Sequence, residues 1–309
     1  PLKKLSDKQG YSSILMNDES NTPTGSFKAR GISVAISKAR ELGIDKLIIP
    51  TAGNAGGALA AYCAKAGMEC IVIMPEHTPD TFKSECELYG AKLITVKGLI
   101  NDCAKKANEV NDKNAYFNIS TLKEPYRLEG KKTMGYEIAE QLNWQLPDVI
   151  VYPAGGGTGL IGIWKAFDEM LKMGWINKPF PKMIAVQTAN CAPIKAALQD
   201  PDHWEKEFIP KPTIAHGLAV PFPFGMHLIL KTLDESKGGV ITVTEKEIRD
   251  GMNEIAKTEG ILVSPEGSAA WMAIAHLKQK GSVKDNDNIL FFNTASGYKY
   301  MENFPGKIK

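Results

Sequence analysis

The chain has 309 residues, of which 43% are hydrophobic and 23% are charged, as is ordinary for a globular enzyme with a substantial core. This length exceeds the usual size of one domain, so two domains are expected. The formal net charge is +2, from 37 basic and 35 acidic residues, and without a long basic stripe it gives no support for a nucleic-acid partner.

Cysteine and histidine usage argues against cross-links and metals. The five cysteines are odd in number and lack paired spacing, which disfavours a disulfide framework and a zinc site. The five histidines show no ligand spacing, so no metal is expected. No uncharged apolar run approaches about 18 residues, and no signal segment opens the sequence. We therefore expect a cytoplasmic protein without a membrane span, and Pro1 in place of Met suggests that residues precede this sequence.

Short apolar runs alternate with helical stretches along the chain. The runs that predict buried strands are residues 46–50, 70–74, 92–96, 148–152, 183–186 and 288–292. The stretches that predict helices are residues 55–66, 127–142 and 160–172, and residues 200–224 predict a long loop. This is the pattern of βαβ units, so the predicted fold class is α/β, with mostly parallel twisted sheets flanked by helices.

Lys28 begins a predicted helix behind small and hydroxylated residues, Thr24, Gly25 and Ser26. Burial and the positive end of a helix both disfavour an ammonium group, so such a lysine can lose its proton and form an imine with an aldehyde. The alternative is a solvated lysine in a first helical turn that Thr24 or Ser26 caps. This segment alone leaves both interpretations open.

Two glycine-rich turns, at residues 51–57 and 155–159, each lie between a predicted strand and a predicted helix. Ligands collect at such strand ends in parallel sheets. Three successive glycines in the second turn let several backbone amides face one anion, and the expected ligand is a phosphate monoester. A nicotinamide enzyme would need an acidic residue where Gln187 stands. The alternative for the first turn is a tight bend in which Asn54 caps the helix.

Three further features could contribute to a site. A cationic cluster surrounds the start of the helix at 127–142, namely Lys123, Arg127, Lys131 and Lys132. Such clusters are usually solvated, but members that point inward would suit a phosphorylated substrate, and Arg127 is the best candidate because its guanidinium binds in a bidentate manner. Thr294 is either a turn residue or a hydroxyl for a ring nitrogen. Glu266 is a first-turn acid and at most a neighbour of the site.

Four motifs, taken in order, resemble the fold-type II pyridoxal-phosphate enzymes and, among them, the threonine synthase group. They are residues 21–28 (Asn-Thr-Pro-Thr-Gly-Ser-Phe-Lys), 51–56, 155–159 and 293–300. The resemblance covers nearly the whole chain. It implies two α/β domains with the cofactor in the cleft between them. The smaller would comprise residues 29–125 and the larger residues 1–28 and 126–309.

The resemblance also implies roles for individual residues. Lys28 would hold pyridoxal 5'-phosphate as an internal aldimine, Asn54 would contact the ring hydroxyl, and Thr294 would bond the pyridine nitrogen. The implied cofactor-binding residues are Phe27, Lys28, Asn54, Gly155, Gly156, Gly157, Thr158, Gly159 and Thr294. The implied substrate-binding residues are Thr51, Ala52, Gly53, Asn54, Ala55, Ser120 and Arg127.

The resemblance implies a lyase that converts O-phospho-L-homoserine and water to L-threonine and phosphate by β,γ-elimination and rehydration. It also implies that the protein is a homodimer. A serine or threonine dehydratase and a diaminopropionate ammonia-lyase remain alternatives, because both perform β-elimination on this fold. The cations around Arg127, and the end of the sequence soon after Thr294, favour the synthase. Ala52 replaces a common serine, and residues 120–125 are longer than the pattern, so the substrate stays open.

Overall fold

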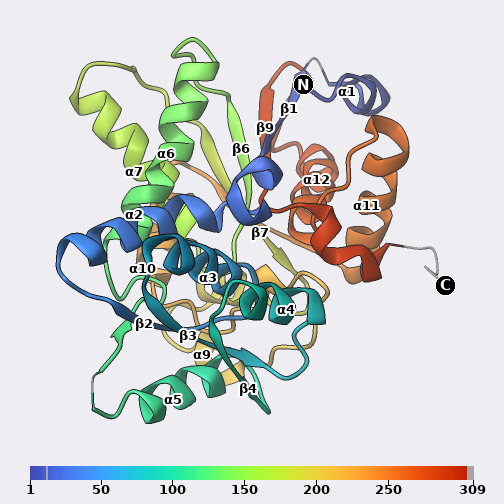
Figure 1. Ribbon diagram of the computed structural model, residues 1–309. Coiled ribbons are helices and arrows are strands. Elements are labelled where there is room, and N and C mark those ends of the chain that lie inside the picture. Colours follow the sequence, from blue (N-terminus) through green and yellow to red (C-terminus); the bar gives the residue numbers. More distant parts are fainter. Residues whose placement is uncertain (12, 114, 305–309) are drawn as a thin grey trace. The chain divides into compact units, whose positions relative to one another are not determined.

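A computed structural model describes residues 1–11, 13–113 and 115–304. The chain forms two compact units, one of Pro1–Asn21 and Lys132–Lys309 and the other of Thr22–Lys131. Both are built from parallel strands and helices (Figure 1), which confirms the α/β class. The domain boundaries expected at residues 28 and 125 stay a prediction.

The larger unit contains a five-stranded parallel sheet in the order β1-β9-β6-β7-β8. The strands are β1 (Ser13–Asp18), β6 (Val149–Pro153), β7 (Lys182–Thr188), β8 (Gly239–Val243) and β9 (Asn288–Asn293). Strands β6, β7 and β9 confirm predicted apolar runs. Strands β1 and β8 were not predicted, because they form the two edges of the sheet and only some of their residues are buried.

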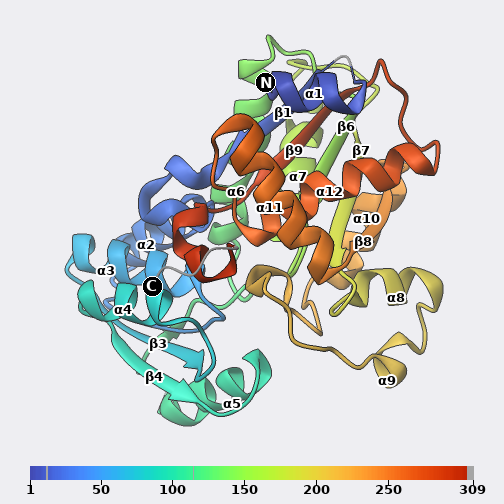
Figure 2. The same cartoon turned by 90° about the vertical axis from the view of Figure 1, so that its right-hand side faces the viewer.

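Helices cover both faces of this sheet. The helices of this unit are α1 (Lys3–Gln9), α6 (Tyr126–Gln141), which begins in the smaller unit, α7 (Thr158–Lys172), α8 (Pro193–Gln199), α9 (Trp204–Glu207), α10 (Met226–Glu235), α11 (Glu245–Glu259) and α12 (Pro265–Gln279). Helix α12 packs across β6, β7, β8 and β9 with α11 beside it, and α7 lies on the opposite face (Figures 1 and 2). The predicted loop at residues 200–224 contains only α9 and the short 3-10 helix η3 (His216–Leu218).

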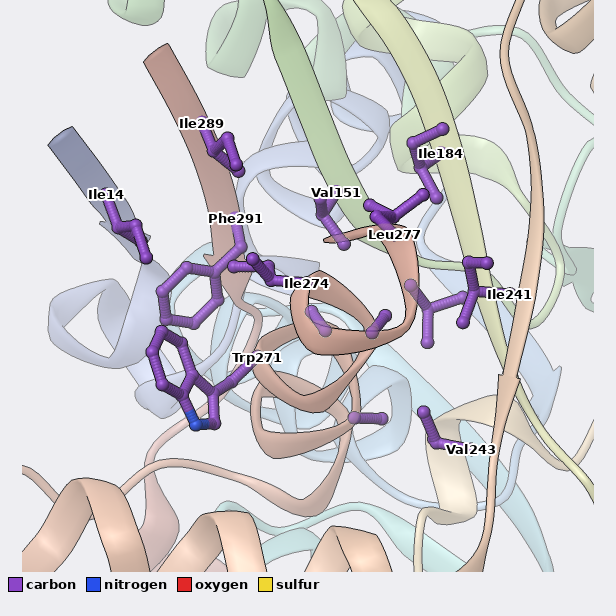
Figure 3. Close-up of a cluster of buried hydrophobic side chains, with 14 of the residues drawn as sticks. Ile14, Val151, Ile184, Ile241, Val243, Trp271, Ile274, Leu277, Ile289 and Phe291 are labelled. Atoms are coloured by element: carbon purple, nitrogen blue, oxygen red, sulfur yellow. The ribbon is translucent and has the colours of Figure 1, made fainter. Parts of the chain in front are cut away.

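The core of the larger unit lies between the sheet and α12. Figure 3 shows Ile14, Ile289 and Val151 from three strands facing Trp271 and Ile274 of α12. These side chains are almost wholly buried, with exposures of 0–2%. Because neighbouring parallel strands present alternate residues to one face, α12 fills the centre of this layer, and Ile248 and Met252 of α11 and Leu5 of α1 join the same cluster. The packing holds the carboxyl ends of the strands at one fixed edge.

The smaller unit contains a four-stranded parallel sheet in the order β4-β3-β2-β5. Its elements are η2 (Pro23–Gly25), α2 (Lys28–Glu41), β2 (Lys46–Pro50), α3 (Asn54–Ala66), β3 (Glu69–Pro75), α4 (Asp80–Leu88), β4 (Lys92–Val96), α5 (Ile100–Val110) and β5 (Phe117–Asn118). Helix α5 packs on one face, where Ile48 and Ile71 meet Cys103, and α3 packs on the other (Figure 2). Among its strands, only the two-residue β5 was not predicted, and the predicted helices did not include α4 and α5.

The described residues bear on two expectations from the sequence, which concern the cysteines and a membrane-spanning helix. All five cysteines are free and buried. Within the described part of the chain, we find no helix whose length and apolar character would let it span a membrane.

Two glycines bring α2 into close contact with the first turns of α6. A Cβ atom on Gly130 would lie 2.2 Å from the carbonyl oxygen of Arg30, and one on Gly31 would lie 2.5 Å from that of Arg127. Backbone atoms cannot give way as a flexible side chain does, so neither position accepts a side chain at this separation. The approach places the residues that follow Lys28 directly against the turn that carries Arg127.

We predict that Gly130→Ala lowers the free energy of unfolding by about 1–3 kcal/mol, the usual cost of overpacking. Urea unfolding of the purified variant measures this. Gly239→Ala is the matched control, because a Cβ atom there meets no atom within 4 Å. It should change the free energy of unfolding by about 0.5 kcal/mol or less. Equal stability of the two variants would contradict the close approach of α2 and α6.

Candidate active site

The glycine-rich turn of the larger unit joins β6 to α7. Gly157 is the N-cap of α7 and has a left-handed backbone, with φ of 70°. A Cβ atom on Gly155 would lie 2.2 Å from the carbonyl oxygen of Gly217, and one on Gly159 would lie 1.8 Å from the hydroxyl of Tyr152. The turn therefore requires glycine. Its backbone amides, which carry no side chains at these glycines, continue into the first turn of α7, a helix of 15 residues. Such a terminus attracts an anion.

Glu266 supports this turn from behind. Its side chain is 4% exposed, and its Oε1 accepts a hydrogen bond from the backbone amide of Gly217 at 2.7 Å. Gly217 is the residue against which Gly155 packs. The Oε2 atom of Glu266 is buried and has no hydrogen-bond partner among the described residues. Glu266, which the sequence offered only as a neighbour, therefore positions the glycine-rich turn.

Thr294 follows β9 and is 4% exposed. The preceding residue, Asn293, is fixed by three hydrogen bonds. Its Oδ1 accepts from the amide of Ser264 at 3.1 Å and from its hydroxyl at 3.3 Å, and its Nδ2 donates to Asp18 at 2.8 Å. Strands β9 and β6 are parallel neighbours. Thr294 and the turn at Gly155 therefore leave the same edge of one sheet.

Lys28 is the first residue of α2, as the sequence predicts, and is half-buried. Its Nζ lies 4.0 Å from the centroid of the Phe27 ring, a distance suited to a cation–π contact. The alternative in which Thr24 or Ser26 caps the helix is wrong, because Phe27 is the N-cap and no side chain caps the helix. Instead, the Ser26 hydroxyl is fully buried and has no hydrogen-bond partner among the described residues. A buried hydroxyl of this kind is typical of a ligand site.

The turn at residues 51–55 joins β2 to α3. The Thr51 hydroxyl accepts from the amide of Gly53 at 3.2 Å, and Gly53 has φ of 152° with the Phe82 ring 3.4 Å from where a Cβ atom would lie. Asn54 is the first residue of α3 rather than its cap, because the N-cap is Gly53 and no side chain caps the helix. The capping alternative for Asn54 is therefore wrong. Ala52 and Asn54 are half-buried, and Ala55 is buried.

Ser120 lies at the same edge of the smaller sheet as Thr51, since β5 pairs in parallel with β2. Its amide donates to Asn118 Oδ1 at 3.0 Å, and its hydroxyl donates to the same oxygen. The adjoining residue, Ile119, accepts a 2.7 Å hydrogen bond from Nη1 of Arg127. Arg127 thus contacts the backbone of the residue next to Ser120, and the shared substrate role of the two residues stays a prediction.

Arg127 points inward and is 3% exposed. Its Nε atom is buried and has no hydrogen-bond partner among the described residues. Burial lowers the pKa of Arg127 to about 10, and the charge of Glu124 opposes that change. The Glu124 carboxylate accepts from the amides of Tyr126 and Arg127 at 2.6 and 3.1 Å, and burial raises the pKa of that carboxyl.

Lys131 lies one helical turn beyond Arg127 and is 1% exposed. Its Nζ lies 5.4 Å from the centroid of the Phe27 ring, the same ring that Lys28 faces. Burial lowers the pKa of Lys131 well below its ordinary value, the charges of Arg127 and Lys28 lower it further, and Glu124 opposes them. Sequence reasoning placed Lys131 in a cationic cluster but not in the site. The spacing of four residues from Arg127 was the available signal.

The remaining members of the cationic cluster do not join this group. Lys132 forms an ion pair with Glu169 at 2.8 Å, and Lys123 is exposed. In the ranges that the structure describes, no set of three or more His, Cys, Asp or Glu side chains is arranged to hold a metal ion.

Comparisons with known proteins identify the class. Residues 1–295 match the family described as pyridoxal-phosphate dependent enzyme, and the chain belongs to that family. It is 32% identical to threonine synthase of Methanocaldococcus jannaschii over 96% of this chain and 73% of that protein. It is also 32% identical to threonine synthase of Methanosarcina acetivorans over 94% of this chain and 72% of that protein.

A solved structure shares the fold. The processed form of threonine deaminase isoform 2 from Solanum lycopersicum superposes with a TM-score of 0.79 at 21% identity, covering 98% of this chain and 85% of that one. Family and relatives together support a pyridoxal-phosphate-dependent lyase of fold type II. The residues present fit the cofactor. The glycine-rich turn at residues 155–159 has no space for Cβ atoms at Gly155 and Gly159, and it leads into the start of α7, where a phosphate group can bind.

We predict that Lys131→Met raises the free energy of unfolding near pH 7. The folded-state pKa of Lys131 is lowered, so between that pKa and the ordinary lysine value of about 10.4 the unfolded chain binds the extra proton. Lys131 therefore costs stability near pH 7, and this cost vanishes as the pH rises past about 10.4. The gain from Lys131→Met should therefore be larger near pH 7 than above about pH 10.4.

Urea unfolding at several pH values measures the gain. Lys132→Met is the matched control, since it removes the neighbouring lysine from an ion pair with Glu169 and should give no gain. An unchanged or lower stability of Lys131→Met near pH 7 would show that Lys131 is not a desolvated amine.

Proposed function

We propose that this protein is a threonine synthase that converts O-phospho-L-homoserine and water to L-threonine and phosphate. The observation that carries the proposal is the inward orientation of Arg127, which is 3% exposed beside Ser120 and in the same unit as Lys28. A dehydratase substrate has no phosphate group to occupy such a site. The relatives named threonine synthase support the same choice.

In this proposal the larger unit holds the cofactor by its phosphate and ring. The backbone of Gly155, Gly156, Gly157 and Gly159, with Thr158, binds the phosphate, and the uncharged Thr294 hydroxyl accepts or donates a hydrogen bond at the ring nitrogen. When bound, pyridoxal phosphate supplies an electron sink for carbanion chemistry. A hydroxyl at that position carries no charge, so it does not hold a proton on the ring nitrogen.

The smaller unit supplies the reacting and substrate-binding groups. Lys28 carries the cofactor and, once released, its amine moves protons between substrate carbons. Its position at the start of α2 beside the Phe27 ring limits the distance that the amine has to move between those carbons. Asn54 meets the ring hydroxyl of the cofactor.

The substrate-binding residues divide between the two ends of the substrate. Thr51, Ala52, Gly53 and Ala55 bind its carboxylate, and the turn that they form is buried except at Ala52, which is half-buried. Ser120 and Arg127 bind its phosphate through a hydroxyl and a guanidinium. A homodimer and a cytoplasmic location belong to this proposal, the first from the resemblance to threonine synthases and the second from the free cysteines.

We predict that borohydride reduction of the holoenzyme fixes the cofactor to Lys28, because reduction makes an imine permanent. Peptide mass spectrometry locates the label. Lys28→Ala should carry no label and lose at least about a thousandfold in activity. Lys38→Ala, on the same helix and paired with Glu41, is the control and should be labelled normally. A label on Lys131 or on any other lysine would overturn the role given to Lys28.

We predict phosphate release from O-phospho-L-homoserine and little keto acid from serine or threonine. Arg127→Met should lower kcat/KM for the phosphorylated substrate by about 10²–10³-fold, the loss expected for a charged contact in a desolvated site. The visible absorbance of the bound cofactor should persist.

Lys123→Met, which removes an exposed cation from the same segment, controls for general electrostatics and should retain activity. Deamination of threonine or serine without phosphate release from O-phospho-L-homoserine would instead identify a dehydratase. Loss of both cofactor absorbance and activity in Arg127→Met would show that Arg127 has a structural role only.

A further inference from the structure

The first turn of α12, with its N-cap Ser264, is buried in the larger unit as far as Gly267. The Ser264 hydroxyl accepts a hydrogen bond from the amide of Gly267 at 3.1 Å. Pro265 occupies the start of the helix, where its ring fixes the backbone angle φ. A cap and a proline leave this turn little freedom, so the groups that it carries are held at fixed positions.

Glu266 connects this turn to the glycine-rich turn after β6. Its Oε1 accepts from the amide of Gly217 at 2.7 Å, and a Cβ atom on Gly217 would lie 2.9 Å from the same oxygen. On its other side, the carbonyl oxygen of Gly217 lies 2.2 Å from where a Cβ atom on Gly155 would be. Gly217 therefore lies between the Glu266 carboxylate and Gly155, and the carboxylate determines how close it stays to α12.

Ser264 connects the same turn to the residue before Thr294. Its amide and its hydroxyl donate to Asn293 Oδ1 at 3.1 and 3.3 Å. A Cβ atom on Gly267 would lie 2.4 Å from that oxygen, so the turn packs directly on the Asn293 side chain. Asn293 is fully buried, so water cannot replace the turn as its hydrogen-bond partner.

The residues that precede this turn hold the chain after Thr294. Val263 and Ser296 form an antiparallel β-bridge, and the amide of Gly297 donates to the carbonyl oxygen of Leu262 at 3.0 Å. A Cβ atom on Gly297 would lie 2.6 Å from that carbonyl oxygen, so the two segments are in close contact. Thr294 is thus held on both sides by residues 262–267.

We propose that Glu266 is a positioning residue for the cofactor, and that the first turn of α12 fixes the phosphate-binding turn relative to Thr294. This assignment rests on the proposed cofactor roles of Gly155 and Thr294. In those roles the two residues hold opposite ends of one rigid molecule, so their separation has to stay constant. A single turn that contacts both ends achieves this, with Glu266 on the phosphate side and Ser264 on the ring side.

The two contacts of the turn should affect the cofactor differently. Glu266 acts on the phosphate side, so its loss should weaken binding of pyridoxal 5'-phosphate but not of pyridoxal, which has no phosphate group. Ser264 belongs to the turn itself, so its loss should weaken binding of both. Glu266 Oε2 has no hydrogen-bond partner among the described residues. Glutamine should therefore replace Glu266, because its side-chain oxygen can accept the same hydrogen bond from Gly217.

Equilibrium dialysis of the enzyme against pyridoxal 5'-phosphate, and after its removal against pyridoxal, measures both affinities through the visible absorbance of the bound compound. Glu266→Ala should weaken binding of pyridoxal 5'-phosphate by about tenfold or more, the loss expected for a hydrogen bond to a charged group. Its affinity for pyridoxal should equal that of the parent. Glu266→Gln should restore the affinity for pyridoxal 5'-phosphate. Glu266→Asp keeps the charge but is too short to reach Gly217, so it should behave as Glu266→Ala does.

Ser264→Ala should weaken binding of both compounds by about fivefold, the factor that corresponds to one lost N-cap. Thr244→Ala is the matched control, because Thr244 is the N-cap of α11 and its hydroxyl accepts from the amide of Glu247. Urea unfolding should show a similar loss of stability in the two variants. Both affinities of Thr244→Ala should equal those of the parent.

Binding of pyridoxal 5'-phosphate by Glu266→Ala and Glu266→Asp with the affinity of the parent would overturn the role given to Glu266. An equal loss of affinity for pyridoxal in these variants would do the same, because it would show a general disturbance of the site. Affinities of Ser264→Ala that match those of Thr244→Ala would overturn the role given to the turn.

These outcomes are separable from that of the proposed function, because the dialysis does not involve the substrate. The expected affinities in an enzyme that deaminates threonine or serine, and releases no phosphate from O-phospho-L-homoserine, would refute the substrate assignment alone. Release of phosphate by an enzyme whose Glu266→Ala variant binds the cofactor as the parent does would refute this inference alone.

Discussion

The burial of Arg127 and Lys131 on one face of α6 is the interaction on which the site in the smaller unit depends. Removing two basic groups from water is unfavourable, and Glu124 is the carboxylate that opposes the loss of their protons. A sequence selected for stability alone would place apolar side chains there. The retention of these cations is understandable if an anionic ligand binds beside Arg127 during function.

Two glycines make this burial possible. Gly31 and Gly130 let the backbones of α2 and α6 approach so closely that neither position could hold a methyl group. Helix α2 begins at Lys28, whose Nζ faces the ring of its sequence neighbour Phe27, and the contact with α6 brings Lys131 to the same ring. Backbone packing and the placement of the basic groups are therefore linked within this unit, since any widening of the helix pair would move Lys131 away from that ring.

The sequence predicted most of the fold because central parallel strands are buried on both faces and read as continuous apolar runs. Edge strands β1 and β8 keep partly exposed residues, so periodicity did not reveal them. The order of the four motifs along the sequence predicted the candidate residues. In the structure, Thr294 and the turn at Gly155 both leave the same edge of the five-stranded sheet. The burial of Lys131 was not predictable, because a basic side chain at that spacing is normally solvated, and only the packing of α2 against α6 decides otherwise.

In the proposed function the protein holds two phosphate groups by different means, and the difference follows from how long each must stay. Backbone amides of the turn at Gly155 cannot change their charge, which suits a cofactor phosphate that remains bound. In the same proposal the Arg127 side chain and the Ser120 hydroxyl hold a phosphate product that has to leave.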